Sequence, residues 1–234
     1  RLPEYYPTRT EIGLLNRYRE DIAQMLGDDG LLIELGSGSD AKMRVLLEAI
    51  QPMAYAPIDI SHEPLRLAAG AIAQDHPNLE VHAICADYSK PLELSGIFDV
   101  RQRAVFFPGS NIGNFDPTEA RALLRRIARL LGPDGRLLIG VDLKKAPARL
   151  DAAYNDTQGV TAEFNLNLLT RINRELDADF DVSAFRHEAA YNEKLGRVEM
   201  HLVATVPQRV RIDGCCFEFQ AGESIHTESS YKFS

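Results

Sequence analysis

The segment Leu31–Ala41, with the sequence LLIELGSGSDA, decides the fold of this chain. A short apolar run, Leu31–Leu35, leads directly into a loop that holds Gly36 and Gly38. Such a run is typical of a strand that is covered on both faces of a sheet. The two glycines allow a tight turn against a ligand that a side chain would exclude, and the amides of the helix that follows favour a negatively charged group. The segment therefore predicts the strand, loop and helix of a nucleotide-binding fold.

The same alternation of strand and helix extends from about residue 11 to residue 143. We expect strands at Leu31–Leu35, Ala54–Ile60, Glu80–Cys85, Ala104–Phe107 and Leu137–Val141, with helices from Thr10, over Ala41–Ile50, over Glu63–Gln74 and over Pro117–Leu131. Strands that alternate with helices predict an α/β fold, a Rossmann-like parallel sheet with helices on both faces. Ligands of such sheets bind at the carboxyl ends of the strands.

The pattern changes after residue 144. We expect two helices and then short strands, at Ala148–Asn155, Val160–Glu175, Phe185–Tyr191, Val198–Val206, Arg209–Ile212, Cys216–Phe219 and Ile225–Ser229. This predicts a smaller α+β domain. The expected organisation is a cofactor-binding domain at 11–143, a substrate-binding domain at 144–226, and active-site segments at 1–10 and 227–234.

Composition excludes several classes of partner. The chain has 234 residues, a formal net charge of −8 and a pI near 5.3, which argue against binding to nucleic-acid phosphates. Its apolar runs are too short to span a bilayer. The six histidines and three cysteines show no metal-ligand spacing, so we predict no metal site. Cysteines without a pairing pattern are typical of a reducing compartment, and we predict a cytoplasmic protein that binds neither membrane nor nucleic acid.

Polar residues at the strand ends indicate the kind of ligand. Asp59 follows Gly38 by 21 residues and could accept the ribose hydroxyls of an adenosine. Asp87 and Tyr88 could meet the edge and face of the adenine, and Lys42 could bind a carboxylate. Each residue also has an ordinary structural interpretation, as a helix cap, a turn residue or a solvated lysine. The spacing Gly36-x-Gly38-x-x-Ala41 is compatible with NAD as well as with S-adenosylmethionine.

Longer segments resemble one enzyme family. The chain resembles the histidine-specific Nα-methyltransferases of ergothioneine biosynthesis over essentially its whole length, in the segments LPEYYPTRTE (2–11), ELGSG (34–38), GSNIGN (109–114), GVTAEFN (159–165) and TESSYKF (227–233). The first of these and GSNIGN are specific to that family, unlike the glycine loop. Family members continue at both ends, so we expect the chain to be truncated at both ends.

The resemblance implies a class I methyltransferase that transfers three methyl groups from S-adenosylmethionine to the α-nitrogen of histidine, giving N,N,N-trimethylhistidine (hercynine). The residues implied for the cofactor are Gly36, Ser37, Gly38, Lys42, Asp59, Asp87, Tyr88 and Gly109. For the substrate, the resemblance implies Asn114 and Tyr154 at its amino and carboxylate ends, and these two residues would also be catalytic. Around the imidazole it implies Tyr5, Met200, Glu228 and Ser230.

The chemistry of methyl transfer suits these residues. The nucleophile is a neutral amine, and because α-amino groups titrate at about pKa 8, no strong base is needed. Glu228 and Ser230 share one face of a strand, where a carboxylate and a hydroxyl suit the two nitrogens of an imidazole. Three alternatives stay open: methylation of another small amino acid or amine, an NAD-dependent oxidoreductase, and a ligand-binding subunit without catalysis.

Overall fold

The computed structural model describes residues 1–234 except 1, 3, 29, 38–39, 93 and 95–101. The chain folds into two compact units. One comprises residues 7–142, and the other comprises residues 143–234 together with residues 1–6. The roles of cofactor and substrate domain stay predictions.

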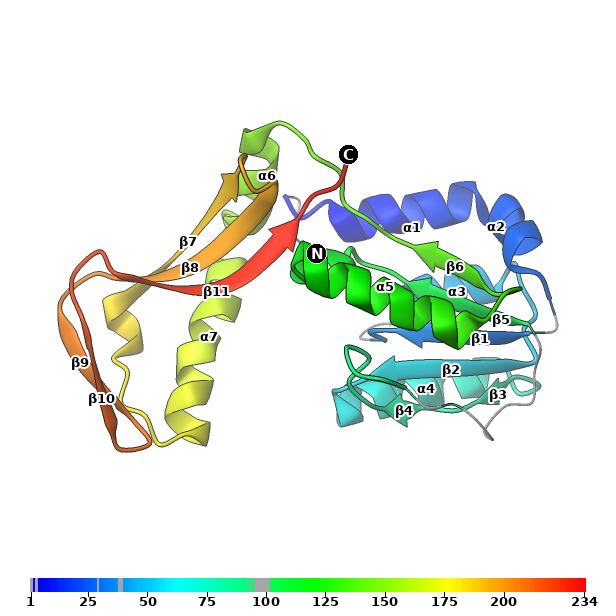
Figure 1. The fold of residues 1–234 in the computed structure, drawn as a ribbon, viewed down its shortest axis with the longest axis horizontal. Helices are drawn as coiled ribbons and strands as arrows, with labels where there is room; N and C mark the ends of the chain where they lie inside the picture. Colours follow the sequence, from blue (N-terminus) through cyan, green and yellow to red (C-terminus); the bar gives the residue numbers. More distant parts are fainter. Residues whose placement is uncertain (1, 3, 29, 38–39, 93, 95–101) are drawn as a thin grey trace. The chain divides into compact units, whose positions relative to one another are not determined.

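A parallel sheet forms the centre of the 7–142 unit (Figure 1). Its strands are β1 (Leu31–Leu35), β2 (Ala54–Asp59), β3 (Glu80–Val81), β4 (Ile84–Cys85), β5 (Arg103–Phe107) and β6 (Arg136–Ile139). Their order is β3-β2-β1-β5-β6, with β4 also paired to β2. From β1 the chain adds β2 and β3 on one side and then β5 and β6 on the other, so the strand order switches at β1. All five residues of β1 are buried. The predicted α/β class with a parallel core is confirmed.

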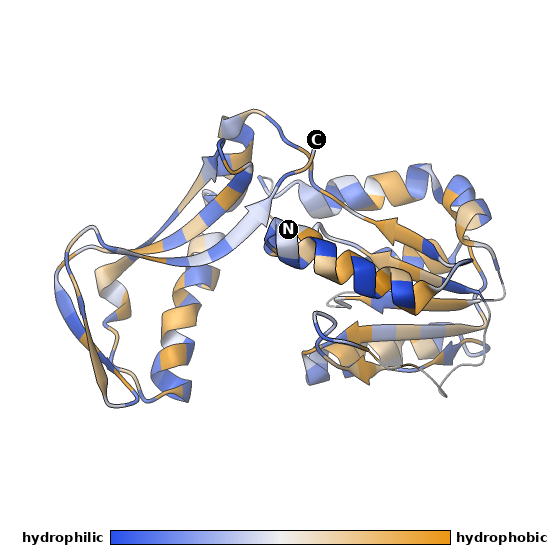
Figure 2. Ribbon diagram, in the orientation of Figure 1, coloured by the Kyte–Doolittle hydropathy of each residue, from blue (hydrophilic) through white to orange (hydrophobic). Residues whose placement is uncertain are grey.

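Helices flank this sheet. They are α1 (Pro7–Arg17), α2 (Arg19–Leu26), α3 (Ala41–Leu47), α4 (His62–Asp75), the 3-10 helix η1 (Asn111–Asn114) and α5 (Pro117–Leu131). Helix α5 begins with a reciprocal cap: the Asp116 carboxylate accepts the amide hydrogens of Thr118 and Glu119, and the Glu119 carboxylate accepts that of Asp116. Its hydrophobic residues form a stripe against the mostly hydrophobic strands (Figure 2).

Two expected elements are divided in the structure, and the helix expected over Ala41–Ile50 ends at Leu47. The strand expected at Glu80–Cys85 is interrupted at His82 and Ala83, although the His82 amide still donates to the Tyr55 carbonyl. The helix expected from Thr10 begins at Pro7, because proline at the first helical position loses no hydrogen bond there. That helix is also broken at Tyr18, so the segment forms two helices.

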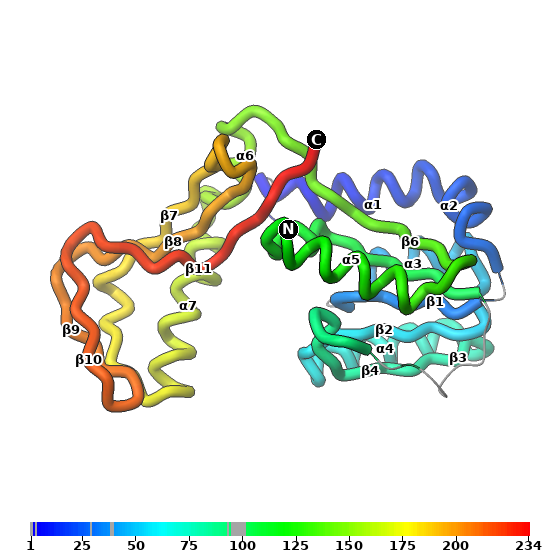
Figure 3. The backbone as a smooth tube through the Cα atoms, in the orientation of Figure 1, coloured from blue at the N-terminus to red at the C-terminus, as the bar shows by residue number. Residues whose placement is uncertain are grey.

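The unit of residues 143–234 and 1–6 combines helices with antiparallel strands. Its elements are α6 (Pro147–Tyr154), α7 (Val160–Glu175), the 3-10 helix η2 (Val182–Ala184), β7 (Phe185–Asn192), β8 (Arg197–Ala204), β9 (Gln208–Ile212), β10 (Cys215–Phe219) and β11 (Ser224–Tyr231). Strands β11-β8-β7 form one sheet, and β9 and β10 form a hairpin (Figure 3). An apolar cluster that includes Tyr6, Leu150, Tyr154 and Met200 packs α6 against the sheet.

A β-bulge at Thr227 determines which side chains of β11 face this cluster. His226 lies opposite His201, and Glu228 lies opposite Met200, so Thr227 is the extra residue between the two pairs. The Thr227 hydroxyl donates to the Met200 carbonyl at 3.0 Å. Because neighbouring residues of β8 point to opposite faces, the bulge places His226 on the outer face and Glu228 on the inner face.

Within the described part of the chain, no helix combines the length and the apolar character that a membrane span requires.

Candidate functional site

Loops from three strands converge around Gly36 at the carboxyl end of β1. Gly36 has φ of +79°, a conformation that favours glycine. A Cβ at this position would lie 3.0 Å from Asn111 Nδ2 and 3.7 Å from the Tyr88 hydroxyl. The loops after β1, β4 and β5 therefore meet here, as the parallel topology predicted. Ser37 is buried beside them, whereas the predicted Gly38 lies outside the described residues.

An acidic residue of α1 joins the two predicted cofactor residues Lys42 and Gly109. Glu11 forms an ion pair with Lys42 Nζ at 2.5 Å, and its two carboxylate oxygens accept the Gly109 amide at 2.9 and 3.0 Å. Gly109 has φ of +80°, and a Cβ there would lie 3.2 Å from Lys42 Nζ. A Cβ at Gly140 would overlap the Glu11 carboxylate, so this glycine makes room for it.

Glu11 and Asn111 were both missed as site residues. Each lies in a segment that carries the family resemblance, Glu11 in residues 2–11 and Asn111 in residues 109–114. That membership was the available signal, but their roles depend on contacts with residues far away in the sequence. Lys42 lies where the sequence placed it, but it already has Glu11 as a counter-ion.

The two predicted aspartates have different surroundings. Asp59 ends β2, and its Oδ1 accepts the Ser61 amide at 2.8 Å. The Asp87 Oδ1 accepts both the hydroxyl of Ser89 at 2.6 Å and its amide at 2.9 Å. The hydroxyl bond is the main reason why the pKa of Asp87 lies below its ordinary value. Asp87 therefore accepts two hydrogen bonds within the turn that follows it, whereas Asp59 accepts one.

Tyr88 forms a wall beside these groups. Its ring centroid lies 5.6 Å from that of Phe107 and 6.5 Å from that of Phe115, both in edge-to-face arrangements. Burial raises the pKa of the Tyr88 hydroxyl, which is therefore protonated at neutral pH. Such a ring can offer an apolar surface to a planar base.

A buried carboxyl group lies directly behind the glycine loop. Glu34 of β1 is 1% exposed and accepts a hydrogen bond from the Tyr55 hydroxyl. The Ser37 hydroxyl lies 3.4 Å from the same Tyr55 oxygen. Burial is the main cause that raises the pKa of Glu34 to about 7, against the hydrogen bonds from Tyr55 and Ser37. Perturbed acids of this kind are common at functional sites.

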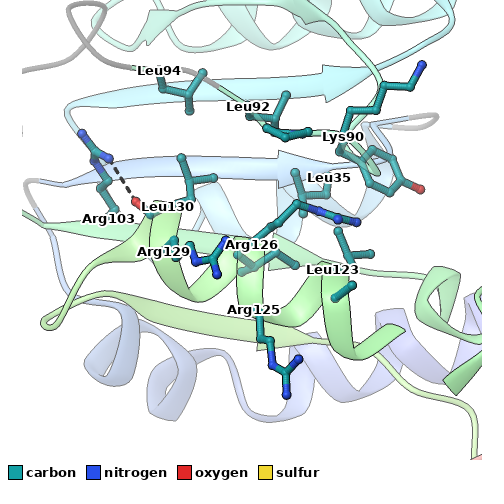
Figure 4. Close-up of a pocket in the computed structure, with 14 residues that line it drawn as sticks. Leu35, Lys90, Leu92, Leu94, Arg103, Leu123, Arg125, Arg126, Arg129 and Leu130 are labelled. Carbon is teal, nitrogen blue, oxygen red and sulfur yellow. Dashed lines mark hydrogen bonds between the residues drawn. The ribbon is translucent and has the colours of Figure 1, made fainter. Parts of the chain in front are cut away.

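A cavity of about 610 Å³ lies beside this cluster, between α5 and the segment after Tyr88 (Figure 4). Leu35 and Tyr88 line it, together with Leu92 and the arginines Arg126 and Arg129 of α5. None of the predicted glycines or aspartates lines this cavity. The group of strand-end residues, rather than this cavity, is therefore the candidate cofactor site.

A buried hydrogen-bond network lies in the other unit, on the inner face of β11. The Tyr154 hydroxyl donates to Ser230 Oγ at 2.8 Å. Lys232 Nζ donates to both of these oxygens, at 2.9 Å each, and lies 4.9 Å from the centroid of the Tyr154 ring. Tyr154, Ser230 and Lys232 are 8%, 6% and 4% exposed. Lys232 was not among the predicted site residues.

The remaining predicted substrate residues of this unit surround that network. Met200 is buried and lies opposite Glu228 across the β8–β11 pair. Burial raises the pKa of the Glu228 carboxyl, whereas the positive charge of Lys232 opposes the shift. The Tyr5 ring lies 6.3 Å from the Tyr154 ring at an angle of 75°. Asn114 instead belongs to the 7–142 unit, where it is exposed at the end of η1.

A second layer holds the backbone of Tyr154. His187 Nε2 donates to the Tyr154 carbonyl at 2.8 Å, and His187 Nδ1 accepts from Asn165 Nδ2 at 3.0 Å. Asn165 is 3% exposed and also donates to the His201 carbonyl. Asn165 ends the segment 159–165 that carried the resemblance, and its hydrogen bonds connect α7 with His187 of β7 and with the His201 carbonyl of β8.

Metal-binding clusters are not found in the described ranges: no three His, Cys, Asp or Glu side chains gather there in a suitable group.

Comparisons with known proteins agree on one family. The model of the histidine-specific, SAM-dependent methyltransferases matches residues 1–234. A histidine N-alpha-methyltransferase of Mycolicibacterium smegmatis is 44% identical over 239 residues, covering all of this chain and 74% of that protein. Ergothioneine biosynthesis protein 1 of Neurospora crassa is 30% identical, over all of this chain and 27% of that protein. A solved S-adenosylmethionine-dependent methyltransferase of Clostridium acetobutylicum shows a low likeness, with a TM-score of 0.46, 11% identity, and coverage of 96% of this chain and 74% of that chain. The chain belongs to the family of histidine-specific methyltransferases that use S-adenosylmethionine.

Proposed function

We propose that this chain methylates the α-amino nitrogen of L-histidine with S-adenosylmethionine, towards N,N,N-trimethylhistidine. The observation that carries this proposal is the inner face of β11, where Glu228 and Ser230 lie next to buried Tyr154 and Met200. These residue types suit an imidazole, and the family match extends over the whole chain. Because that family consists of methyltransferases, the NAD-dependent oxidoreductase is not retained as an alternative.

The residues at the strand ends fit S-adenosylmethionine. Side chains at Gly36 and Gly109 would crowd Asn111 and Lys42, so these two glycines keep backbone surface open for a ligand. We propose that Asp59 holds the ribose and that Asp87 and Tyr88 hold the adenine. Lys42 would bind the carboxylate of the amino-acid tail and would then share its charge between that carboxylate and Glu11. Ser37, Gly38 and Gly109 complete the proposed cofactor site.

The chain's own residues would act by holding and orienting histidine. When bound, S-adenosylmethionine supplies a methyl group on a sulfonium, which an amine lone pair can displace in line. We propose that Asn114 and Tyr154 hold the amino and carboxylate ends, with the Asn114 amide donating to the carboxylate and the Tyr154 oxygen accepting from the amine. The Tyr154 hydroxyl already donates to Ser230, so it also supports the imidazole side of the site. Met200 is buried and the Tyr5 ring is exposed, and we propose that the Tyr5 ring covers the substrate when it is bound. The amine loses its proton to solvent before it is covered, because its pKa is about 8.

The partners we propose are these two small molecules, and neither a membrane nor a nucleic acid. The net charge of −8 disfavours nucleic-acid phosphates. All three cysteines are free and exposed, which is typical of the reducing cytoplasm, and we propose that compartment.

Calorimetry followed by product analysis tests the function. S-adenosylhomocysteine and then histidine are titrated into the full chain, and S-adenosylmethionine with histidine is followed by mass spectrometry. We expect both ligands to bind, with histidine dependent on the first, and products with one, two and three methyl groups. Binding of S-adenosylhomocysteine without histidine would redirect the search to another amine. Binding of both without any methylated product would favour a subunit without catalysis.

Glu228→Ala tests the substrate assignment. The loss of the carboxylate removes the partner of one imidazole nitrogen, so we expect kcat/KM for histidine to fall by at least about tenfold relative to other amino acids. Unchanged histidine kinetics in this variant would contradict the role of Glu228.

A further inference from the structure

Lys232 is a buried cation for which the proposed reaction has assigned no role. It is 4% exposed, and it donates to the hydroxyl oxygens of Tyr154 and Ser230 while lying over the Tyr154 ring. A lysine is almost never this buried unless it is paired, because removing its charge from water is costly. Lys232 directly follows β11, and its position two residues after Ser230 places it on the same side as Ser230.

The three hydrogen bonds among Lys232, Tyr154 and Ser230 run in definite directions. An ammonium can only donate, so the Tyr154 oxygen accepts from Lys232. The Tyr154 hydroxyl in turn donates its hydrogen to Ser230. Ser230 Oγ then accepts two hydrogen bonds, one from Tyr154 and one from Lys232. Both of its lone pairs are used, and its own hydrogen remains to be donated to a ligand. Ser230 can therefore meet a ring nitrogen that has a lone pair, but not one that has a hydrogen.

Lys232 also sets the net charge on this face. Glu228 lies on the same face two residues before Ser230, and Lys232 counteracts the rise that burial causes in the pKa of this carboxyl. A carboxylate alone would favour a protonated imidazole, whereas the carboxylate and ammonium together are neutral. The face therefore offers one hydrogen-bond acceptor, the Glu228 carboxylate, and one donor, the Ser230 hydroxyl.

Other ionisable groups near this face are few in the described structure. Those on the elements that pack against it are Tyr5 and Tyr6 of the N-terminal segment, Arg149, Asp151 and Tyr154 of α6, and His187 and Tyr191 of β7. His187 donates to the Tyr154 carbonyl, Arg149 lies over the Tyr6 ring, and β8 contributes the apolar Val198 and Met200. Asp151 is bonded to the Tyr191 amide. The ionisable side chains of Arg197, Glu199, His201, His226 and Tyr231 lie on the outer face.

We propose that Lys232 is a positioning residue that makes Ser230 a hydrogen-bond donor and thereby selects the neutral imidazole ring of histidine. This inference rests on the proposed function. In the site, Glu228 accepts the N–H of the ring and Ser230 donates to the other nitrogen. Without Lys232, Ser230 is free to accept and the charge of Glu228 is uncompensated, so the same pocket takes the imidazolium.

The experiment follows the protonation of the bound ring directly. Trimethylhistidine with ¹⁵N in the imidazole is bound to the full chain with S-adenosylhomocysteine, and its ¹⁵N shifts are recorded against pH. This ligand has no titrating α-amine, so its imidazole is its only group that changes charge near neutral pH. We expect one nitrogen with and one without hydrogen in the wild type, down to a pH at least about one unit below the free ring's pKa of ~6.5.

Lys232→Met removes the charge and keeps most of the buried volume. We expect the pKa of the bound ring to rise by at least about one unit relative to the wild type, so that both nitrogens carry hydrogen near pH 6.5. Lys194→Met is the matched control, because Lys194 is exposed in the β7–β8 turn of the same unit, and it should leave the ¹⁵N shifts unchanged.

The outcomes separate the two proposals. A wild-type ring that is bound as imidazolium, or a ring pKa that Lys232→Met leaves in place, overturns the role of Lys232 and leaves the function intact. If Lys232→Met does not fold, the protonation state of the ring bound to the wild type still tests the proposal. No binding of trimethylhistidine to the wild type overturns the proposed function, and this inference with it.

Discussion

At the scale of single residues, the burial of Glu34 disfavours the ionised form of its carboxyl group. Its pKa rises from 4.5 to about 7 on folding, mainly through burial. Between these values the folded protein holds a proton that the unfolded chain has released. The free energy of unfolding therefore falls as pH rises from about 4.5 to about 7, and the loss persists above that range.

Glu34→Gln should remove this pH dependence, because the amide keeps an acceptor for the Tyr55 hydroxyl and cannot ionise. We expect wild type and variant to unfold with similar free energies at pH 5. At pH 8 the variant should be more stable by about 2–3 kcal/mol. Urea denaturation at both pH values measures this. If wild type and variant are equally stable at pH 8, ionisation of Glu34 does not destabilise the folded protein.

Glu11 is the opposite case, because its negative charge is stabilised by its partners in the fold. It pairs with Lys42 and accepts the Gly109 amide, and both Glu11 and Lys42 side chains are about 15% exposed. We expect Glu11→Ala to lower the free energy of unfolding by about 2 kcal/mol, because it leaves an amide and an ammonium without this partner. In the Lys42→Met background the loss should be smaller, which a double-mutant cycle in urea measures.

Exposed Glu20 of α2 supplies the control for that cycle. Glu20→Ala should cost less than about 0.5 kcal/mol and should be additive with Lys42→Met. An additive cycle for Glu11 and Lys42 would mean that their ion pair contributes nothing to stability.

At the scale of elements, the sequence predicted most strands and helices because their signals are local. Hydrophobic runs and glycine or proline boundaries identified β1, β2, α5 and α7 to within a residue or two. The interruption between β3 and β4 has no local signal, because it depends on how the segment pairs with β2. Glu228 and Ser230 could be placed on one face from their spacing, but the bulge at Thr227 and the buried Lys232 depend on tertiary contacts.

The bulge itself is open to test. Thr227→Val keeps the branched shape and loses the hydrogen bond to the Met200 carbonyl. We expect a loss of about 1 kcal/mol in unfolding free energy and a severalfold weaker affinity for trimethylhistidine, since Glu228 follows the bulge directly. Affinity for S-adenosylhomocysteine should not change. Calorimetry with each ligand and urea denaturation measure these effects.

Thr205→Val is the matched variant, because the Thr205 hydroxyl donates to the Ala184 carbonyl at 3.0 Å in the same unit. It should lose similar stability and keep full affinity for trimethylhistidine. If both variants weaken binding equally, the effect belongs to general destabilisation and not to the bulge.

At the scale of the whole molecule, the residues proposed for the two ligands belong mainly to different compact units, with Asn114 of the substrate set as the exception. Asp59 lies in the unit of residues 7–142, and Glu228 lies in the unit that contains residues 143–234. The change of pattern after residue 144 predicted such a division into a cofactor-binding and a substrate-binding domain. This division implies that a conservative change in one unit should impair one ligand and spare the other.

Asp59→Asn and Glu228→Gln test this division, because each removes one charge and keeps the side-chain shape and an acceptor oxygen. We expect Asp59→Asn to weaken S-adenosylhomocysteine about tenfold, the effect of one charge-assisted hydrogen bond, and to leave trimethylhistidine unchanged when S-adenosylhomocysteine is saturating. Glu228→Gln should weaken trimethylhistidine about tenfold and leave S-adenosylhomocysteine unchanged. Calorimetry on the full chain gives all four affinities. A variant that loses both ligands while it stays folded would mean that the two units do not divide the binding in this way.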